Sequence, residues 1–148
     1  MAVQLLNMAR AKIELSDILH FSTEIVLRVD DMNYGNHMGN EKVLVLAQEC
    51  RVRFLQSIGC SEFDVFGASI IQADAVIVYK SEGHIGDVIK VGLSVQEISK
   101  SSFDLYYIFE NLTTEKVLAQ AKTGMVFYDY KKGGIVNTPD AFAKKFGQ

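Results

Sequence analysis

The hydrophobic and polar residues of the chain alternate with a period of two over five separate segments. The first covers residues 21–29, where Phe21, Thr23 and Ile25 begin the series. The other four follow one another closely, at residues 68–79, 89–96, 103–110 and 117–127. Alternation of this kind is typical of strands with one buried face, and short connections between successive strands indicate an antiparallel meander.

Residues 41–58 show a helical period instead. Their apolar side chains recur at three- and four-residue steps, at Val43, Leu46, Ala47, Cys50, Phe54 and Ile58. Leu44, Val45, Val52 and Leu55 extend the apolar surface beyond one stripe, which predicts a helix buried on most sides and ended by Gly59. A second, short helix is predicted at 139–146, with Thr138 as its N-cap and Pro139 as its first residue.

The order of these elements predicts an α+β fold in which an antiparallel curved sheet wraps around one long central helix. We expect a single domain over residues 1–148. Residues 1–20 form a lead-in whose structure the pattern leaves open, with a short strand at 11–15 as one interpretation. A single layer leaves the other face and the edges of the sheet uncovered, so we expect a homo-oligomer.

Composition narrows the function classes. Hydrophobic residues make up 49% of the 148, and the net charge is -3 with no basic run, which argues against disorder and against nucleic-acid binding. The longest apolar run, at 43–47, is far shorter than the ~20 residues of a membrane span, and the first eight residues lack the basic start of a signal peptide. Two unpaired cysteines together with the absence of an export signal lead us to expect the cytoplasm. Neither the cysteines nor the three scattered histidines have metal-ligand spacing, so we expect no metal site.

The polar loop 30–40 directly precedes the predicted central helix. It holds Asp30, Asp31, Asn33, Asn36, His37 and Asn40. The start of a helix presents free backbone N–H groups and the positive end of a dipole, which suits a developing oxyanion. The same asparagines could serve only as capping and turn residues, and a lone His37 could be structural.

Glu49 is a charged residue in the middle of a mostly apolar helical segment. One interpretation is a surface ion pair with Arg53, four residues later. The other is a partly buried carboxylate with a raised pKa, suited to act as a general base. The sequence alone leaves both open.

The loop and the start of the helix resemble the signature of the 4-hydroxybenzoyl-CoA thioesterase-like family of hotdog-fold acyl-CoA thioesterases. That signature reads D-x-D-x-x-G-H-x-N-N, with E-x-R about a dozen residues after the His. Here residues 31–40 read Asp-Met-Asn-Tyr-Gly-Asn-His-Met-Gly-Asn, and Glu49-Cys50-Arg51 follows. Asp31, His37, Asn40, Glu49 and Arg51 match. The second Asp of the signature is Asn33 here, its Gly falls on Asn36 next to Gly35, and its first Asn is Gly39.

The resemblance implies the hotdog fold and hydrolysis of an acyl-CoA or acyl carrier protein thioester, without metal or organic cofactor. The catalytic residues it implies are Glu49, Asp31, Asn33 and His37. The residues it places against the substrate are Gly35, Asn36, Met38, Gly39 and Asn40, with the backbone N–H groups of 36–40 around the oxyanion. Because the amide of Asn33 cannot act as a base, Glu49 is the preferred carboxylate. The family also implies a site shared across a homodimer, or within a homotetramer.

Two other functions stay compatible with these residues. A hotdog hydratase or dehydratase acting on a 3-hydroxyacyl thioester would pair His37 with an acid. A non-catalytic acyl-CoA binding protein would need no base, which is compatible with Asn33.

Overall fold

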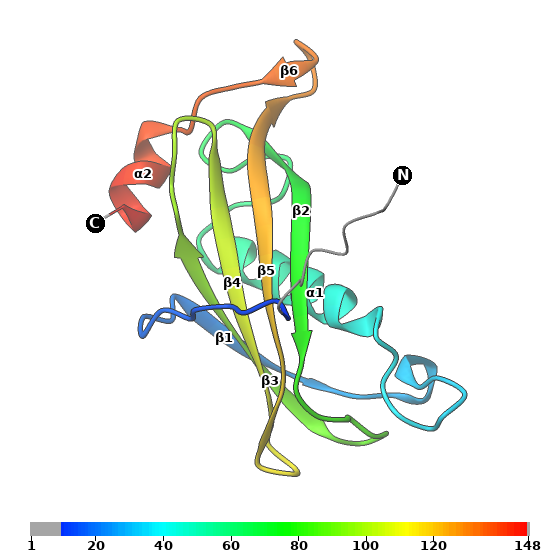
Figure 1. The fold of residues 1–148 in the computed structure, drawn as a ribbon. Helices are drawn as coiled ribbons and strands as arrows, with labels where there is room; N and C mark the ends of the chain where they lie inside the picture. The colour runs from blue at the N-terminus through cyan, green and yellow to red at the C-terminus, as the bar shows by residue number, and fades with distance from the viewer. Residues whose placement is uncertain (1–9, 148) are drawn as a thin grey trace, which may run out of the picture.

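The computed structural model describes residues 10–147, in which a six-stranded antiparallel sheet curls around one helix (Figure 1). The elements in chain order are β1 (Phe21–Val26), a 3₁₀ turn (Val29–Asp31), α1 (Lys42–Ser57), β2 (Ser69–Tyr79), β3 (Val88–Gln96), β4 (Ser102–Asn111), β5 (Lys116–Asp129), β6 (Gly134–Ile135) and α2 (Asp140–Phe146). The predicted α+β hotdog architecture is confirmed. The part of the expected lead-in at residues 1–9 lies outside the described residues.

The strands lie in the order β1-β3-β4-β5-β2, with β6 added beside the end of β5. The predicted meander forms β3, β4 and β5, whereas β2 crosses to the far side of β5 and becomes an edge strand. Neither helix in the described part of the chain is long and apolar enough to cross a membrane.

The core lies between the concave face of the sheet and one face of α1. Along β4 every second side chain is buried, including Phe103, Leu105, Tyr107 and Phe109. From α1, Val43, Leu46, Cys50 and Phe54 are 4% exposed or less. Period-two burial in the sheet thus meets period-3.6 burial in the helix, as the sequence predicts.

Burial of α1 on most sides is a prediction that does not hold within one chain. Val45 is 51% exposed and Leu44 is 36% exposed, because the sheet covers only the opposite face of the helix. The apolar width of the helix therefore exceeds what its own sheet covers, and part of it faces outward.

Four local predictions are corrected. Residues 11–15 form no strand, β1 ends at Val26, and β6 was not predicted. Pro139, not Thr138, is the N-cap of α2, because the Thr138 hydroxyl donates instead to the carbonyl of Ser99 at 2.7 Å. That bond ties the start of α2 to the β3–β4 turn.

The outer face of the sheet is partly covered from within the chain. Residues 12–19 cross it, and Leu19 packs so closely on Gly92 that a Cβ there would lie 3.0 Å from Leu19 Cδ1. A second copy is therefore less necessary to cover this face of the sheet. The edges of the sheet and the outward face of α1 stay uncovered by the described part of the chain.

Candidate active site

The loop between the 3₁₀ turn and α1 is a narrow hairpin whose base is pinned on both sides. Met32 and Met38 pair as an isolated antiparallel bridge. The Met38 N–H donates to the Gly83 carbonyl at 2.7 Å, and the Gly39 N–H donates to the Asp31 carbonyl at 3.0 Å. The start of α1 is thereby fixed against the β2–β3 connection.

Asn33 organises the tip of this hairpin. Its Oδ1 accepts hydrogen bonds from the Gly35 N–H at 2.9 Å and from the His37 N–H at 3.4 Å. The backbone of this tip takes a positive φ, of 62°, at Asn36 and not at the neighbouring Gly35. Asn tolerates this left-handed conformation better than most residues. The side chain that replaces the family's second Asp therefore shapes the loop.

The backbone N–H groups of residues 36–40 were expected to surround an oxyanion, and four of the five are already used. Those of Asn36, His37, Met38 and Gly39 donate to acceptors within the chain. Among the acceptors in residues 10–147, none takes the N–H of Asn40 or of Glu41, which are the two residues directly before α1. Glu41 is the N-cap and makes no side-chain cap bond, so neither Asn36 nor Asn40 caps the helix as the alternative suggested.

His37 lies half-buried beside these groups. Its Nδ1 is 3.3 Å from the Met38 carbonyl and 3.5 Å from Nδ2 of Asn33. The first contact needs a proton on Nδ1 and the second needs a lone pair there, so the two belong to opposite tautomers. In the first tautomer, Nε2 carries the lone pair.

A cavity of about 320 Å³ opens at the start of α1. It is lined by His37, Met38, Gly39, Asn40, Val43, Tyr79, Lys80, Ser81, Glu82, Gly83 and Leu118. The Tyr79 hydroxyl donates to the Asn40 carbonyl at 3.0 Å, which joins the end of β2 to the loop. We call this the loop cavity. It brings together four of the predicted site residues: His37, Met38, Gly39 and Asn40.

Glu49 and Asp31 line a different cavity, of about 470 Å³, between β1 and the other side of α1. Glu49 is 48% exposed and accepts a 2.8 Å ion pair from Nε of Arg53, as the surface interpretation predicted. Asp31 is buried and accepts a 2.8 Å hydrogen bond from the Arg28 N–H, which stabilises the 3₁₀ turn. Glu49 lies seven residues into α1, about 10 Å along the axis from its start. It therefore cannot reach a carbonyl held in the loop cavity of its own chain.

Sequence reasoning missed two residues of the loop cavity, Tyr79 and Glu82. Tyr79 ends a predicted strand and Glu82 follows it in a turn, so neither stood out from its surroundings. Only the crossing of β2 to the sheet edge brings them to the loop. Glu82 is the one carboxylate in the cavity lining, and its Oε2 lies 3.8 Å from Nε2 of His84.

Arg51, which matches the signature, performs a buried structural role. Its guanidinium donates to Glu62 at 2.8 Å and to Gln72 Oε1 at 3.2 Å, joining α1 to the following loop and to β2. Burial of the neighbouring Cys50 raises the pKa of its thiol to about 12, so this cysteine is an inert core residue. Residues 10–147 hold no group of three or more His, Cys, Asp or Glu side chains that could bind a metal ion.

Comparison with known proteins agrees with this geometry. A family model described as the thioesterase-like superfamily matches residues 27–146. The 1,4-dihydroxy-2-naphthoyl-CoA thioesterase Slr0204 from Synechocystis is 19% identical, with a TM-score of 0.76 over 85% of this chain and 94% of that one. SAV2348 from Staphylococcus aureus, solved in complex with CoA, is 17% identical, with a TM-score of 0.76 over 89% and 85% of the two chains. A thioesterase-superfamily protein from Jannaschia is 14% identical, with a TM-score of 0.78 over 88% and 83%.

Among curated proteins, none is significantly similar to the chain. The structural neighbours share its fold at low identity, while the family model spans most of its length. The chain therefore belongs to the thioesterase-like superfamily and has the hotdog fold of a thioester hydrolase.

Proposed function

We propose that this protein hydrolyses acyl-CoA thioesters and that the reaction takes place in the loop cavity. The observation that carries the proposal is that the N–H groups of Asn40 and Glu41, next to His37 and at the start of α1, have no acceptor among residues 10–147. Donors without an internal acceptor at a helix start are suited to the negative charge that develops on a carbonyl oxygen. The CoA complex of SAV2348 supports the choice of CoA as the leaving group.

In the proposed reaction, water attacks the thioester carbonyl carbon while the carbonyl oxygen accepts hydrogen bonds from the N–H groups of Asn40 and Glu41. A carboxylate takes one proton from the attacking water. The tetrahedral intermediate then breaks its C–S bond, and the departing sulfur takes a proton as CoA thiol. In this proposal His37 holds the water, or supplies that proton, through Nε2.

Two carboxylates are candidates for the base, and they place different demands on the assembly. Glu82 lies in the cavity lining of the same chain. Glu49, preferred from the sequence, would have to come from a second copy because of its distance from the start of its own helix. Glu49→Gln and Glu82→Gln each keep the shape of the side chain and remove its basicity.

We propose a homodimer as the working assembly. The edge strand β2 offers a second copy its whole length, Ser69–Tyr79, which contains no proline and whose one charged residue, Asp74, is paired with Lys122. Unprotected apolar edges of this kind pair with other strands. Leu44 and Val45 on the outward face of α1 add apolar surface. We place the protein in the cytoplasm, since both of its cysteines are free.

The test is thiol release from a panel of acyl-CoAs by the wild-type protein and the two Gln variants. The variant of the true base should lose at least ~100-fold in turnover, since general-base assistance contributes 10²–10⁴-fold. Asp31→Asn is the matched control, because it changes a carboxylate that the loop cavity does not contain. If neither Gln variant loses activity, the carboxylate mechanism is wrong.

The same panel separates the alternatives. Binding of acyl-CoA without thiol release would support a non-catalytic binding protein, a function favoured by the structural use of Asn33. A change in enoyl absorbance without thiol release would support a hydratase or dehydratase.

A further inference from the structure

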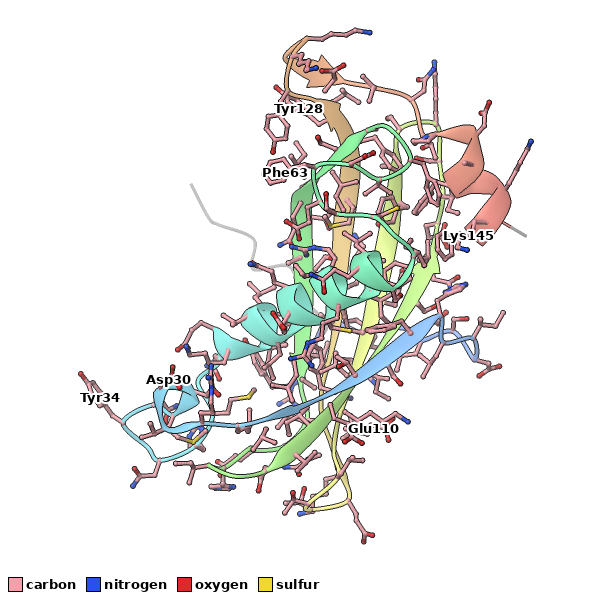
Figure 2. The ribbon with its side chains drawn as sticks, turned by 180° about the vertical axis from the view of Figure 1, so that it is seen from behind. Asp30, Tyr34, Phe63, Glu110, Tyr128 and Lys145 are labelled. Atoms are coloured by element: carbon pink, nitrogen blue, oxygen red, sulfur yellow. The ribbon has the colours of Figure 1, made fainter. Side chains whose placement is uncertain are left out.

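A cluster of aromatic and basic side chains, all exposed except the half-buried Tyr128, lies at the end of the sheet opposite the loop cavity. It consists of Phe63, Tyr128, Tyr130, Lys131 and Lys132, and we call it the aromatic–lysine patch. Phe63 is 75% exposed and Tyr130 is 58% exposed, although their ring centroids are only 6.0 Å apart. Tyr130 also packs edge-on against Tyr128 at 5.2 Å. Figure 2 shows Phe63 and Tyr128 together at this end, far from Tyr34 on the loop.

The patch is held in place by a rigid turn. The Asp129 carboxylate accepts hydrogen bonds from the backbone N–H groups of Lys131 and Lys132, at 2.8 and 3.1 Å. These bonds lower the pKa of Asp129, so its carboxylate stays charged and committed to the turn. Neither lysine side chain forms an ion pair with any other residue in 10–147. Two lysines without an ion pair in the described residues therefore follow Tyr128 and Tyr130 directly in the turn.

The two ends of β2 relate this patch to the loop cavity. Ser69, the first residue of β2, pairs with Tyr128, and its hydroxyl donates to the Phe63 carbonyl at 2.8 Å. Tyr79, the last residue of β2, lines the loop cavity. Eleven residues of strand separate the patch from the cavity by roughly 30 Å within one chain.

Antiparallel pairing of two β2 edges changes that relation. A two-fold axis near the middle of the strand sets the Ser69 end of one copy beside the Tyr79 end of the other. The aromatic–lysine patch of one protomer then lies next to the loop cavity of its partner. Each cavity gains a neighbouring surface that its own chain cannot supply.

We propose that the aromatic–lysine patch binds the 3′-phosphorylated ADP end of a CoA thioester whose acyl end lies in the partner's loop cavity. This rests on the acyl-CoA hydrolysis proposed above. Aromatic faces stack on a purine without regard to its edges, and lysine side chains bind phosphates as point charges. The cavity lining contains one lysine, Lys80, alongside Glu82, so it offers little net positive charge for the nucleotide phosphates.

The experiment compares an acyl-CoA with the same acyl group on pantetheine, which lacks the nucleotide. Tyr130→Ser and the double variant Lys131→Gln/Lys132→Gln should each raise KM for the acyl-CoA about tenfold, since stacking and phosphate contacts are of that size. Neither should change kcat/KM for the acyl-pantetheine. The matched control is Lys144→Gln/Lys145→Gln on α2, which removes the same charge elsewhere and should leave both KM values unchanged (Figure 2). Unchanged KM for acyl-CoA, or equal losses on both substrates, would overturn the proposal.

Mixed dimers test the arrangement across the two copies. One protomer carries Asn40→Trp, which fills the loop cavity from an exposed position, and the other carries the patch variant Lys131→Gln/Lys132→Gln. If the patch serves the partner's cavity, each mixed dimer has one intact site, and wild-type KM returns in about a quarter of all sites after random mixing. If it serves its own cavity, or only packs against a second copy, no site with wild-type KM appears.

The measurements distinguish failure of the hydrolase proposal from failure of the proposed nucleotide site. A protein that releases thiol from neither substrate is not the proposed hydrolase. Calorimetric titration with CoA then still tests the patch, which predicts about tenfold weaker binding for Tyr130→Ser than for the wild type. Equal affinity for the two would overturn the patch whatever the activity.

Discussion

Asn33 stands where the family signature has an aspartate, but its amide cannot act as a base. The family signature has a carboxylate there, whereas here the side-chain oxygen holds the hairpin through the N–H groups of Gly35 and His37. The asparagine side chain still offers an oxygen that accepts hydrogen bonds, but it lacks the basicity of a carboxylate. Its importance should therefore appear in loop geometry rather than in proton transfer.

We expect Asn33→Ala to lower turnover about 30-fold, because two hydrogen bonds of about 1 kcal/mol each order the loop beside His37. Asn33→Asp keeps the acceptor oxygen and should retain most of the turnover. Thiol-release kinetics on both variants check this. Equal losses in the two would show that Asn33 acts through its NH₂ group instead.

Gly39 has a narrower role than its place in the signature implies. A Cβ at this residue would lie 2.5 Å from Oε1 of Glu41, whose flexible side chain folds back over it. Gly39→Ala should therefore displace the Glu41 carboxylate and leave the fold intact, with a change in melting temperature of no more than a few degrees. We expect a clear change in KM for the acyl-CoA, whereas the stability stays close to that of the wild type. A large loss of stability, measured by thermal unfolding, would contradict this.

At the scale of elements, β2 and β5 are joined by a side chain as well as by their ladder. Their register shifts between Gln72 and Asp74, and Asp74 accepts hydrogen bonds from the Gly124 N–H at 2.8 Å and from Lys122 Nζ at 2.9 Å. A Cβ at Gly124 would lie 2.6 Å from Asp74 Oδ1. The glycine and the carboxylate therefore form one unit that holds the irregular edge strand.

Gly124→Ala should lower the free energy of unfolding by about 1–2 kcal/mol, because Asp74 must move and leaves the Gly124 N–H without its acceptor. Asp74→Ala should cost a similar amount. The double variant should cost much less than the sum of the two, since both substitutions remove the same interaction. Urea unfolding of the three variants checks this, and simple additivity would show that the two residues act separately.

His20 links β1, β3 and α2. Its Nδ1 accepts the Val95 N–H at 3.0 Å, and its ring packs edge-on against Phe146 at 5.4 Å. Burial lowers the pKa of His20 from 6.5, so the unfolded chain binds this proton more readily than the folded protein. The free energy of unfolding should thus be constant above pH 6.5 and fall as the pH drops toward the folded-state pKa.

His20→Gln retains an acceptor and has no proton to take up in this range. Its free energy of unfolding should therefore depend less on pH than that of the wild type between pH 7 and 5. Denaturant unfolding of both proteins across that range checks the sign. Parallel pH profiles would show that His20 is not protonated on unfolding.

For the whole molecule, the central question is what covers the β2 edge and the outward face of α1. Residues 12–19 cover part of the sheet's outer face, whereas Val76 and Tyr79 on β2 and Leu44 and Val45 on α1 stay exposed. A dimer through that edge accounts for both the exposed strand and the distance between the patch and the cavity.

Light scattering should therefore find a species of twice the 16.5 kDa chain mass. Ala75 is exposed on β2, so Ala75→Arg should leave the protomer folded while it blocks the pairing of two edges. We expect a monomer with native circular dichroism and a raised KM for acyl-CoA. A dimer that survives Ala75→Arg would place the interface elsewhere.

The alternating strands, the presence of a helix over 41–58 and the loop signature could be predicted from the sequence alone, because periodicity and turn residues are local properties. Tertiary structure alone decided that β2 crosses to the edge, since alternation says nothing about which strands pair. That crossing brings Tyr79 and Glu82 to the loop. The tertiary structure also decided that Glu49 is half-exposed and paired with Arg53. Helical spacing shows which residues share a face of the helix, but not whether the sheet covers that face.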